Sequence, residues 1–377
     1  MNESTTHTSA PWDHGSLRPR DDGRVIEHAD GTSFFWLGDT GWLLFSRLDR
    51  DEAKRYLDDR REKGFNVIQI MLVHRLPTEN IYGREFDSFD VIDWKAGRPM
   101  DHTDDYWSVV DEMIGFAEER GLYAALVPVW GSVVKSGALS EETAREYGAW
   151  LGSHFRDRPN IVWLNGGDIQ GDVRPDVWHA LGRAIKEHDP NHLMTFHPFG
   201  RTDSSTWFHD AEWLDFNSFQ SGHRRYDQST EVDSEGHLPH AEDNWRFVLA
   251  DLERTPCKPT IDSEPSYEGI PQGLHDPKEP FWEACDVRRY AYWSVAAGAF
   301  GHTYGHSAIM QRSNSRPVAT ASDRPGQRRS MRPGRDRCAT SGRSSKAPTD
   351  SMRRRSFWKA AVSATIASSR TEAQDTQ

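Results

Sequence analysis

Apolar residues recur along the chain in short continuous runs, and turn residues or polar segments separate one run from the next. Eight runs have the length of a buried strand: 33–42, 66–73, 122–130, 161–168, 193–199, 214–222, 258–269 and 300–306. Continuous apolar runs of this kind are typical of strands that are buried on both faces of a parallel sheet. The pattern therefore predicts eight strands in one sheet.

The intervals between the runs carry helix signals. Helices are predicted over 49–64, 104–121, 140–155, 175–189, 240–256 and 280–298. Gly64 closes the first of them, Ser140 begins the third ahead of two acidic residues, and Pro175 stands in the first turn of the fourth. Eight strands that alternate with helices predict an α/β fold of the (β/α)8 TIM barrel type.

Polar residues stand at the C-terminal ends of the runs, where parallel barrels carry their functional groups. In chain order these ends hold Asp39, His74, Trp130, Asn165 with Asp168, His197, Gln220, Glu264 and His306. One polar residue at a strand end is ordinary helix-capping chemistry. Eight on one rim predict a functional site. The stretch 161–171 shows the pattern most clearly, because its buried run ends in Asn-Gly-Gly-Asp and the glycines let the backbone approach a ligand.

Two of these residues are carboxylates on the fourth and seventh runs, which face each other across a barrel mouth. This placement suits an acid and a nucleophile on either side of a glycosidic bond, about 5–5.5 Å apart for retention or roughly 6.5–9.5 Å for inversion. We assign Asp168 as general acid and base and Glu264 as nucleophile. The alternatives are a turn cap for Asp168 and a buried ion pair for Glu264. Glu268 is the rival nucleophile, but it lies in the following loop.

Substrate contacts are expected from side chains at or beside the strand ends, namely Asp39, Trp42, His74, Trp130, Asn165, His197, Gln220, Tyr267 and His306. Asp39 either binds a sugar hydroxyl or braces its own turn. Trp42 and Trp130 either stack on a sugar or close the barrel. His197 and Gln220 either bind hydroxyls or support the nucleophile. An oligosaccharide substrate is thus expected, and no cofactor.

Charge divides the chain into two parts. Residues 312–377 carry a net charge of +10, whereas residues 1–311 carry -22. An acidic body repels phosphate backbones, which argues against nucleic acid as a partner. The basic part is rich in Arg, Ser, Pro and Gly without helical or strand periodicity, so a disordered tail is predicted. We hypothesise that this tail is translated out of frame, the alternative being a genuine basic tail. The expected organisation is a flexible segment at 1–22, a barrel at 23–311 and the tail at 312–377.

Location and redox state are predicted from what the chain lacks. No apolar run reaches membrane length, and the first residues do not have the layout of a signal peptide. A cytoplasmic enzyme without membrane contact is therefore expected. The three cysteines, Cys257, Cys285 and Cys338, are far apart and odd in number, which predicts reduced thiols rather than a disulfide framework.

Five motifs in order, WLGDTGWLLF, GFNVIQIMLV, NIVWLNGGD, DSEPSYEG and GHTYGH, resemble the apiosidase-like glycoside hydrolases of family 140 over residues 12–311. The resemblance implies a (β/α)8 barrel that hydrolyses O-glycosidic bonds in polysaccharide degradation, with apiose-linked side chains of pectin as the founding case. By motif, the family's catalytic Asp matches Asp168 and its catalytic Glu matches Glu264. Asn165 is similar to the amide that contacts the sugar 2-hydroxyl in many barrel glycosidases.

Two other functions are kept as alternatives. Seventeen histidines and the HTYGH motif suggest a metal-dependent barrel hydrolase, although the first run holds only Asp39 and no His-x-His pair. A sugar-binding barrel without catalysis is the other alternative, and the presence of both carboxylates argues against it. The chain also departs from the family after Gln311, where relatives continue into an eighth helix and a small β-sandwich. The sugar, the linkage and the oligomeric state do not follow from the sequence.

Overall fold

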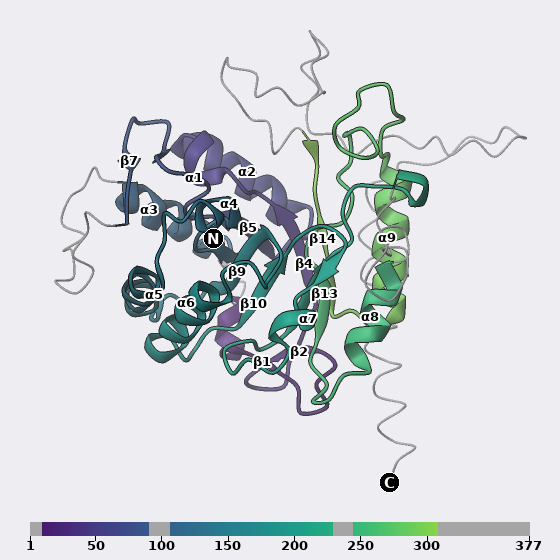
Figure 1. Cartoon of the computed structure of the whole chain (residues 1–377), viewed down its shortest axis with the longest axis horizontal. Coiled ribbons are helices and arrows are strands. Elements are labelled where there is room, and N and C mark those ends of the chain that lie inside the picture. The colour runs from purple at the N-terminus through teal and green to yellow at the C-terminus, as the bar shows by residue number, and fades with distance from the viewer. Residues whose placement is uncertain (1–9, 90–105, 229–243, 308–377) are drawn as a thin grey trace, which may run out of the picture. The chain divides into compact units, whose positions relative to one another are not determined.

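The computed structural model of the chain describes residues 10–89, 106–228 and 244–307 (Figure 1). The chain divides into a compact unit, Met1–Arg332, and a second unit, Pro333–Gln377, and every described residue belongs to the first. The predicted tail at 312–377 therefore lies outside the described residues.

Eight parallel strands form a (β/α)8 barrel, as predicted. They are β4 Trp36–Thr40, β5 Val67–Met71, β8 Tyr123–Val127, β9 Ile161–Ile169, β10 Met194–Pro198, β12 Asn217–Gln220, β13 Thr260–Asp262 and β14 Gly301–Tyr304. Six of them make one sheet in the order β10-β9-β8-β5-β4-β14, and β12 and β13 pair in a second sheet with β11 (Thr202–Asp203). Each predicted apolar run supplies one of the eight strands, which confirms the sequence pattern.

Two seams join these sheets into the barrel. At the seam between β10 and β12, the hydroxyl of Thr195 donates to the carbonyl oxygen of Phe216 at 2.6 Å. At the seam between β13 and β14, the backbone N–H of Phe300 donates to the carbonyl oxygen of Thr260 at 3.2 Å. The wall is therefore continuous, but individual hydrogen bonds rather than a regular ladder connect its two sheets.

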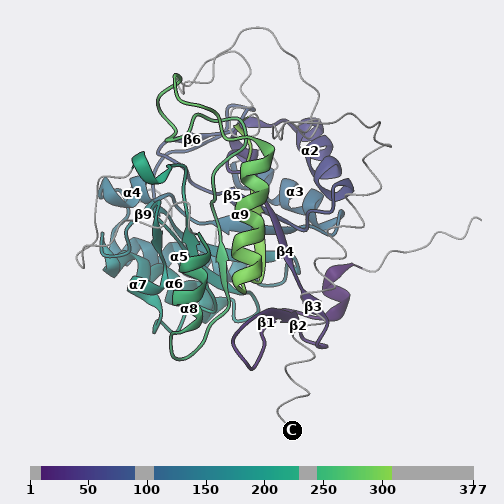
Figure 2. The same ribbon diagram turned by 90° about the vertical axis from the view of Figure 1, so that its right-hand side faces the viewer.

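Helices cover the outside of the barrel. The long ones are α2 Arg50–Glu62, α3 Tyr106–Glu118, α5 Glu141–Phe155, α6 Pro175–His188, α8 Asn244–Leu252 and α9 Ala284–Ala297. Figure 1 shows α2, α3, α5 and α6 on one flank, and Figure 2 shows α9 across the outside of the opposite flank. Asp49 begins α2 with a capping box, and the hydroxyl of Ser140 caps α5. Among the described residues no helix has the length and apolarity needed to cross a bilayer.

Three helices have only four or five residues: α1 Leu44–Arg47, α4 Gly131–Lys135 and α7 Ser205–Phe208. The long helices α2 and α5 follow α1 and α4 in the same intervals, whereas no long helix accompanies α7 between β10 and β12. The remaining short elements are the hairpin β6 Thr78–Glu79 with β7 Glu85–Phe86, and the 3-10 helix η3 Tyr226–Gln228. The interval between β10 and β12 thus has one turn of helix, whereas the neighbouring intervals hold the fourteen residues of α6 and the nine of α8. This difference shapes the outer surface of the barrel at that point.

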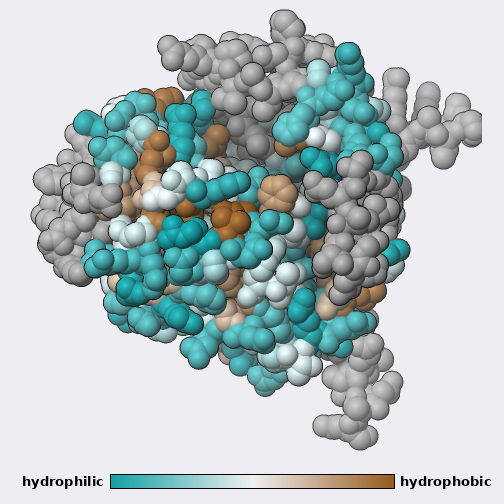
Figure 3. Space-filling view, viewed as in Figure 1, coloured by the Kyte–Doolittle hydropathy of each residue, from teal (hydrophilic) through white to brown (hydrophobic). Residues whose placement is uncertain are grey.

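The core has two layers because side chains of a strand alternate between its faces. On β9, Trp163 packs outward among the helices, whereas Val162 and Leu164 fill the barrel interior. Buried hydrophobic residues account for both layers, and the surface seen in Figure 3 is mostly hydrophilic with small hydrophobic patches. The direction of each side chain therefore depends on its place in this alternation, which matters for the site below.

The prediction of a flexible N-terminal segment at 1–22 is wrong for residues 10–22. They form the 3-10 helix η1 Pro11–His14 and strand β1 Leu17–Pro19, which pairs with β2 Ile26–His28, and β2 pairs in turn with β3 Ser33–Phe34. Trp12 packs edge-on against Tyr123 at 5.8 Å between ring centroids, and Leu17 joins the interior cluster. Two apolar residues within a polar stretch therefore suffice to hold this segment on the barrel.

Candidate active site

The backbone at the end of β9 brings Asp168 to the barrel mouth. Gly166 and Gly167 have φ values of +89° and +133°, in the region that favours glycine. A Cβ on Gly166 would lie 2.7 Å from the carbonyl oxygen of His197, and one on Gly167 would lie 2.4 Å from the ring of Trp130. The Asn-Gly-Gly-Asp sequence is therefore needed for close packing at this strand end. Asp168 follows with φ +50° and an exposed side chain.

Glu264 stands two residues beyond β13, is 5% exposed, and accepts three hydrogen bonds. Its Oε2 lies 2.9 Å from Nε2 of His197. Its Oε1 lies 3.2 Å from Nε2 of His223 and accepts from the hydroxyl of Tyr267 at 2.5 Å. The indole N–H of Trp42 donates to that hydroxyl at 2.6 Å. A buried chain of donors therefore ends on one carboxylate.

Ser263 orients the imidazole of His197. The Ser263 hydroxyl lies 2.9 Å from Nδ1 of His197 and 3.0 Å from the carbonyl oxygen of Phe219. That carbonyl accepts from the Ser263 hydroxyl and also from the backbone N–H of Ser263 at 2.8 Å, so Ser263 is held in place by two hydrogen bonds. The hydroxyl oxygen can therefore accept a hydrogen bond from Nδ1 of His197.

The two carboxylates lie close together. One oxygen of Asp168, one of Glu264 and a ring nitrogen of His197 are all within 4.8 Å of one another. Desolvation by the surrounding protein, followed by the negative charge of Glu264, raises the pKa of Asp168, although Gln220 donates a hydrogen bond to it. Burial would raise the pKa of Glu264 as well, but hydrogen bonds from His197 and His223 hold it well below its usual range.

Opposite pKa shifts on neighbouring carboxyl groups separate their chemical roles. Asp168 is disposed to hold a proton that it can donate, and Glu264 is disposed to remain ionised. The same carboxylates and His197 are also ligand types for a divalent metal. However, Nε2 of His197 and Oε2 of Glu264 are in direct hydrogen-bond contact at 2.9 Å, and Oε1 already faces two donors. The side chains therefore fit a proton-transfer network better than a metal site.

Several of the predicted residues do assemble around this pair. Trp130 is half-buried, with its ring centroid 5.8 Å from that of His197 and 5.7 Å from that of Trp42. Trp42 and Tyr267 are 3% and 0% exposed and make up the donor chain that supports Glu264. The direct substrate contact predicted for both stays a prediction.

Asp39 and Asn165 turn away from the mouth, and the binding role predicted for them is wrong. Asp39 is fully buried, accepts from the hydroxyl of Tyr56 at 2.6 Å, and lies 3.2 Å from Nη1 of Arg60 on α2. Asn165 is also fully buried and donates to the carbonyl oxygen of Trp178 on α6 at 3.0 Å. Both residues occupy outward positions of the strand alternation, so they brace helices.

The two remaining predicted histidines make contacts away from the pair. Nδ1 of His74 lies 2.9 Å from the hydroxyl of Thr78, and desolvation lowers the pKa of His74 to about 4. His306 forms a backbone bridge with Glu268, whose carboxylate accepts from Tyr304 at 2.8 Å. Glu268 is thus engaged with the last strand, which supports Glu264 over its rival.

Sequence reasoning missed His223 and Ser263. His223 lies three residues beyond the end of β12, in a Ser-Gly-His sequence that carries no strand or helix periodicity. Ser263 precedes Glu264 directly. The only signal for either residue is its proximity to a strand end that was already assigned to the site.

Comparisons with known proteins found one family model and several similar solved structures. The family model described as "Apiosidase-like, catalytic domain" matches residues 20–370. A solved structure named "Glycoside hydrolase" is 48% identical with a TM-score of 0.78, and the match covers 84% of this chain and 70% of that one. A glycoside hydrolase family 5 structure from Bacteroides vulgatus is 49% identical with a TM-score of 0.77, covering 81% and 65%.

More distant structures share the fold. The endo-1,4-beta-mannanase from Rhizomucor miehei has a TM-score of 0.54 at 16% identity, and the match covers 77% of this chain and 90% of that one. None of the curated proteins compared with the chain matches it.

Proposed function

Because this chain belongs to the family of apiosidase-like catalytic domains, a family of glycosyl hydrolases, we propose that it cleaves its O-glycosidic bond with retention of configuration. In this proposal Asp168 is the general acid and base, and Glu264 is the nucleophile. The supporting observation is that a carboxylate oxygen of each lies within 4.8 Å of the other. Retaining enzymes place the two carboxyl groups about 5–5.5 Å apart, whereas inverting enzymes leave room for a water between them.

The reaction proceeds in two displacements. In the first, an oxygen of Glu264 forms a bond to the anomeric carbon while the bond from that carbon to the leaving oxygen breaks, and Asp168 transfers its proton to the leaving oxygen. In the second, Asp168 accepts a proton from water, the water oxygen bonds to the anomeric carbon, and Glu264 leaves as a carboxylate. Each residue returns to its starting protonation state.

The hydrogen bonds on Glu264 indicate which of its oxygens attacks. Oε1 faces two donors, Tyr267 and His223, whereas Oε2 faces only His197. We therefore assign Oε2 as the attacking atom, since it retains more lone-pair density. The donors to Oε1 keep the group ionised before attack and stabilise its charge when it leaves. Trp130 offers the aromatic surface against which the sugar packs.

The substrate that we propose is a polysaccharide side chain of plant or bacterial origin, such as an apiose-linked unit of pectin. The family description supports a sugar of that type. The mannanase likeness supports only the barrel, because its identity to this chain is 16%.

The test compares three isosteric variants, Asp168→Asn, Glu264→Gln and Glu268→Gln, on a panel of aryl glycosides that includes an apioside, and on pectic oligosaccharides. We expect Asp168→Asn and Glu264→Gln each to lose nearly all turnover, because the two groups act as one unit. Glu268→Gln is the matched control and should stay close to the parent.

Stereochemistry provides a separate readout. NMR identifies the anomer that is released first, and this anomer should have the configuration of the substrate. Inverted product would refute the double displacement. Near-parental activity in Glu264→Gln would reassign the nucleophile, and activity that requires an added divalent metal and is lost with a chelator would favour the metal-dependent alternative.

A further inference from the structure

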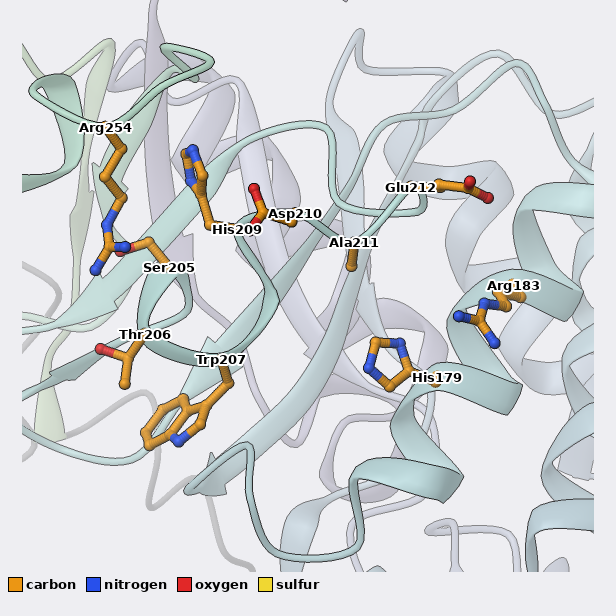
Figure 4. Close-up of a pocket in the computed structure, with 10 residues that line it drawn as sticks. All are labelled: His179, Arg183, Ser205, Thr206, Trp207, His209, Asp210, Ala211, Glu212 and Arg254. Atoms are coloured by element: carbon orange, nitrogen blue, oxygen red, sulfur yellow. The ribbon is translucent and has the colours of Figure 1, made fainter.

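A hollow of about 470 Å³ opens on the outside of the barrel beside α7 (Figure 4). We call it the α7 hollow. The residues that carry the argument are His179, Arg183, Trp207, Asp210, Glu212 and Arg254. Its volume falls within the range of about 300–1,000 Å³ that small-molecule sites occupy. It lies on the barrel wall, whereas Asp168 and Glu264 lie at the C-terminal ends of β9 and β13.

The short helix α7 explains why the wall is hollow here. An α-helix rises about 1.5 Å per residue. The four residues of α7 therefore cover far less of the barrel than the fourteen of α6 or the fifteen of α5. Side chains on this part of the wall, such as Arg183, Asp210 and Arg254, are therefore exposed to solvent.

Trp207 provides a fixed aromatic side to the hollow. Its side chain is half-buried and packs against Gly171, where a Cβ would lie 2.8 Å from Cγ of the indole. Because glycine lets the backbone approach this closely, the base of the indole is held in place while the side chain as a whole stays half-buried. A rigid, partly open indole is a surface on which a sugar ring can stack.

Charged groups surround the hollow without net charge. Arg183 lies four residues after His179 on the same face of α6, and Arg254, whose Nε lies 3.9 Å from a carboxylate oxygen of Asp251, follows α8 on the other side. Asp210 and Glu212 contribute two carboxylates. In the described part of the chain no salt bridge engages Arg183, Asp210 or Glu212.

Balanced charge points to a neutral ligand with many hydroxyls. Guanidinium groups only donate hydrogen bonds and carboxylates only accept them, whereas a hydroxyl does both. A ligand with adjacent hydroxyls can therefore engage both kinds of group at once. An anion or a cation would be attracted by one set of charges and repelled by the other, so a charged ligand gains no net advantage from the lining.

We propose that the α7 hollow is a second carbohydrate site, which holds a neutral sugar unit of the polysaccharide whose bond is cut at the mouth; this inference rests on the proposed function. The chain connects the two places, because Thr202 of β11 is in register with Gln220 at the mouth and α7 begins three residues later. A polymer bound at both places would be retained between cleavage events, whereas a small glycoside would use the mouth alone.

The test uses Arg183→Ala and Trp207→Ala in the full chain, with Arg61→Ala on α2 as the matched exposed-arginine control. Binding is measured in the Glu264→Gln background by affinity gel electrophoresis, with a soluble pectic polysaccharide as the probe. We expect Arg183→Ala and Trp207→Ala each to raise Kd about tenfold, which corresponds to about 1.4 kcal/mol. Arg61→Ala should not change it. Turnover of an aryl glycoside by the active forms should keep the same kcat and KM.

Equal retardation of Arg183→Ala and the parent would overturn the proposal, as would absence of retardation in the parent. Arg183 is exposed, so this variant remains informative if Trp207→Ala folds poorly. If retardation depends on Arg183 but no glycoside is hydrolysed, the second site stands and the proposed function fails. If hydrolysis proceeds while retardation is insensitive to both substitutions, the function stands and the second site fails.

Discussion

Replacing Arg60 by Met should destabilise the protein strongly while leaving substrate affinity unchanged. Asp39 is fully buried, with Nη1 of Arg60 at 3.2 Å and the hydroxyl of Tyr56 at 2.6 Å. Burial raises the pKa of Asp39, and the charge of Arg60 is the main influence against it. Without Arg60, the carboxylate must either remain as an unpaired buried charge or take up a proton.

The expected loss follows from this geometry. Removing one partner of a buried ion pair costs about 3–5 kcal/mol in unfolding free energy. Tyr56 still donates to Asp39 and protonation relieves part of the charge, so the lower end of that range is expected for Arg60→Met. The double variant Asp39→Asn with Arg60→Met should recover part of the loss, because neither side chain is then left charged.

The assay is urea unfolding of the parent, both variants and the exposed control Arg61→Ala, together with KM on any glycoside that the parent cleaves. We expect a lower unfolding midpoint for Arg60→Met, no change for Arg61→Ala and similar KM throughout. A normal midpoint for Arg60→Met combined with a raised KM in the double variant would refute this reasoning and return Asp39 to the substrate.

Three further predictions concern other parts of the barrel. His223→Ala removes a hydrogen-bond donor to Glu264, so the pKa of Glu264 should rise. A hydrogen bond to a charged group contributes about 1.5–3 kcal/mol, so the acid limb of the kcat/KM profile should move about 1–2 pH units upward. An unmoved acid limb would contradict this, and His74→Ala is the control. Gly167→Ala should cost at least about 1–3 kcal/mol in denaturant unfolding, and more than Gly137→Ala, which shares the positive φ but has no atom within 4 Å of its Cβ. Burial and then the charge of Asp203 raise the pKa of Asp251 to about 7, above its ordinary 3.8. Folding stability should therefore fall as pH rises through about 7. Asp251→Asn should remove this pH dependence, as measured by urea unfolding midpoints at about pH 5 and about pH 8.

The strands could be predicted because burial on both faces leaves an uninterrupted apolar run, as at 66–73 and 122–130. The pair Asp168 and Glu264 could be predicted because parallel strands all end on the same rim. Neither inference needs the position of any side chain. The N-terminal strands β1 to β3 have two or three residues each, too few for a period to be recognised.

The errors at Asp39 and Asn165 have one cause. A strand end fixes the height of a residue in the barrel but not the face to which its side chain points. Trp163 on the outer face is two residues before Asn165, so counting in twos would have assigned Asn165 to the helices. His223 is a different case, because it reaches Glu264 from a loop whose path no periodicity describes.

The division of the barrel into two sheets bears on how the stereochemical outcome of glycoside hydrolysis could change. Asp168 ends β9 in the six-stranded sheet, whereas Glu264 follows β13 in the three-stranded sheet. The contacts across the boundary near the mouth, His197 with Glu264 and Gln220 with Asp168, therefore also set the separation of the two carboxylates. Retaining and inverting hydrolases differ by only about 1–4 Å in that separation. Substitutions along β10 and β12 that shift one sheet against the other could thus convert one outcome into the other during evolution, with both carboxylates left in place.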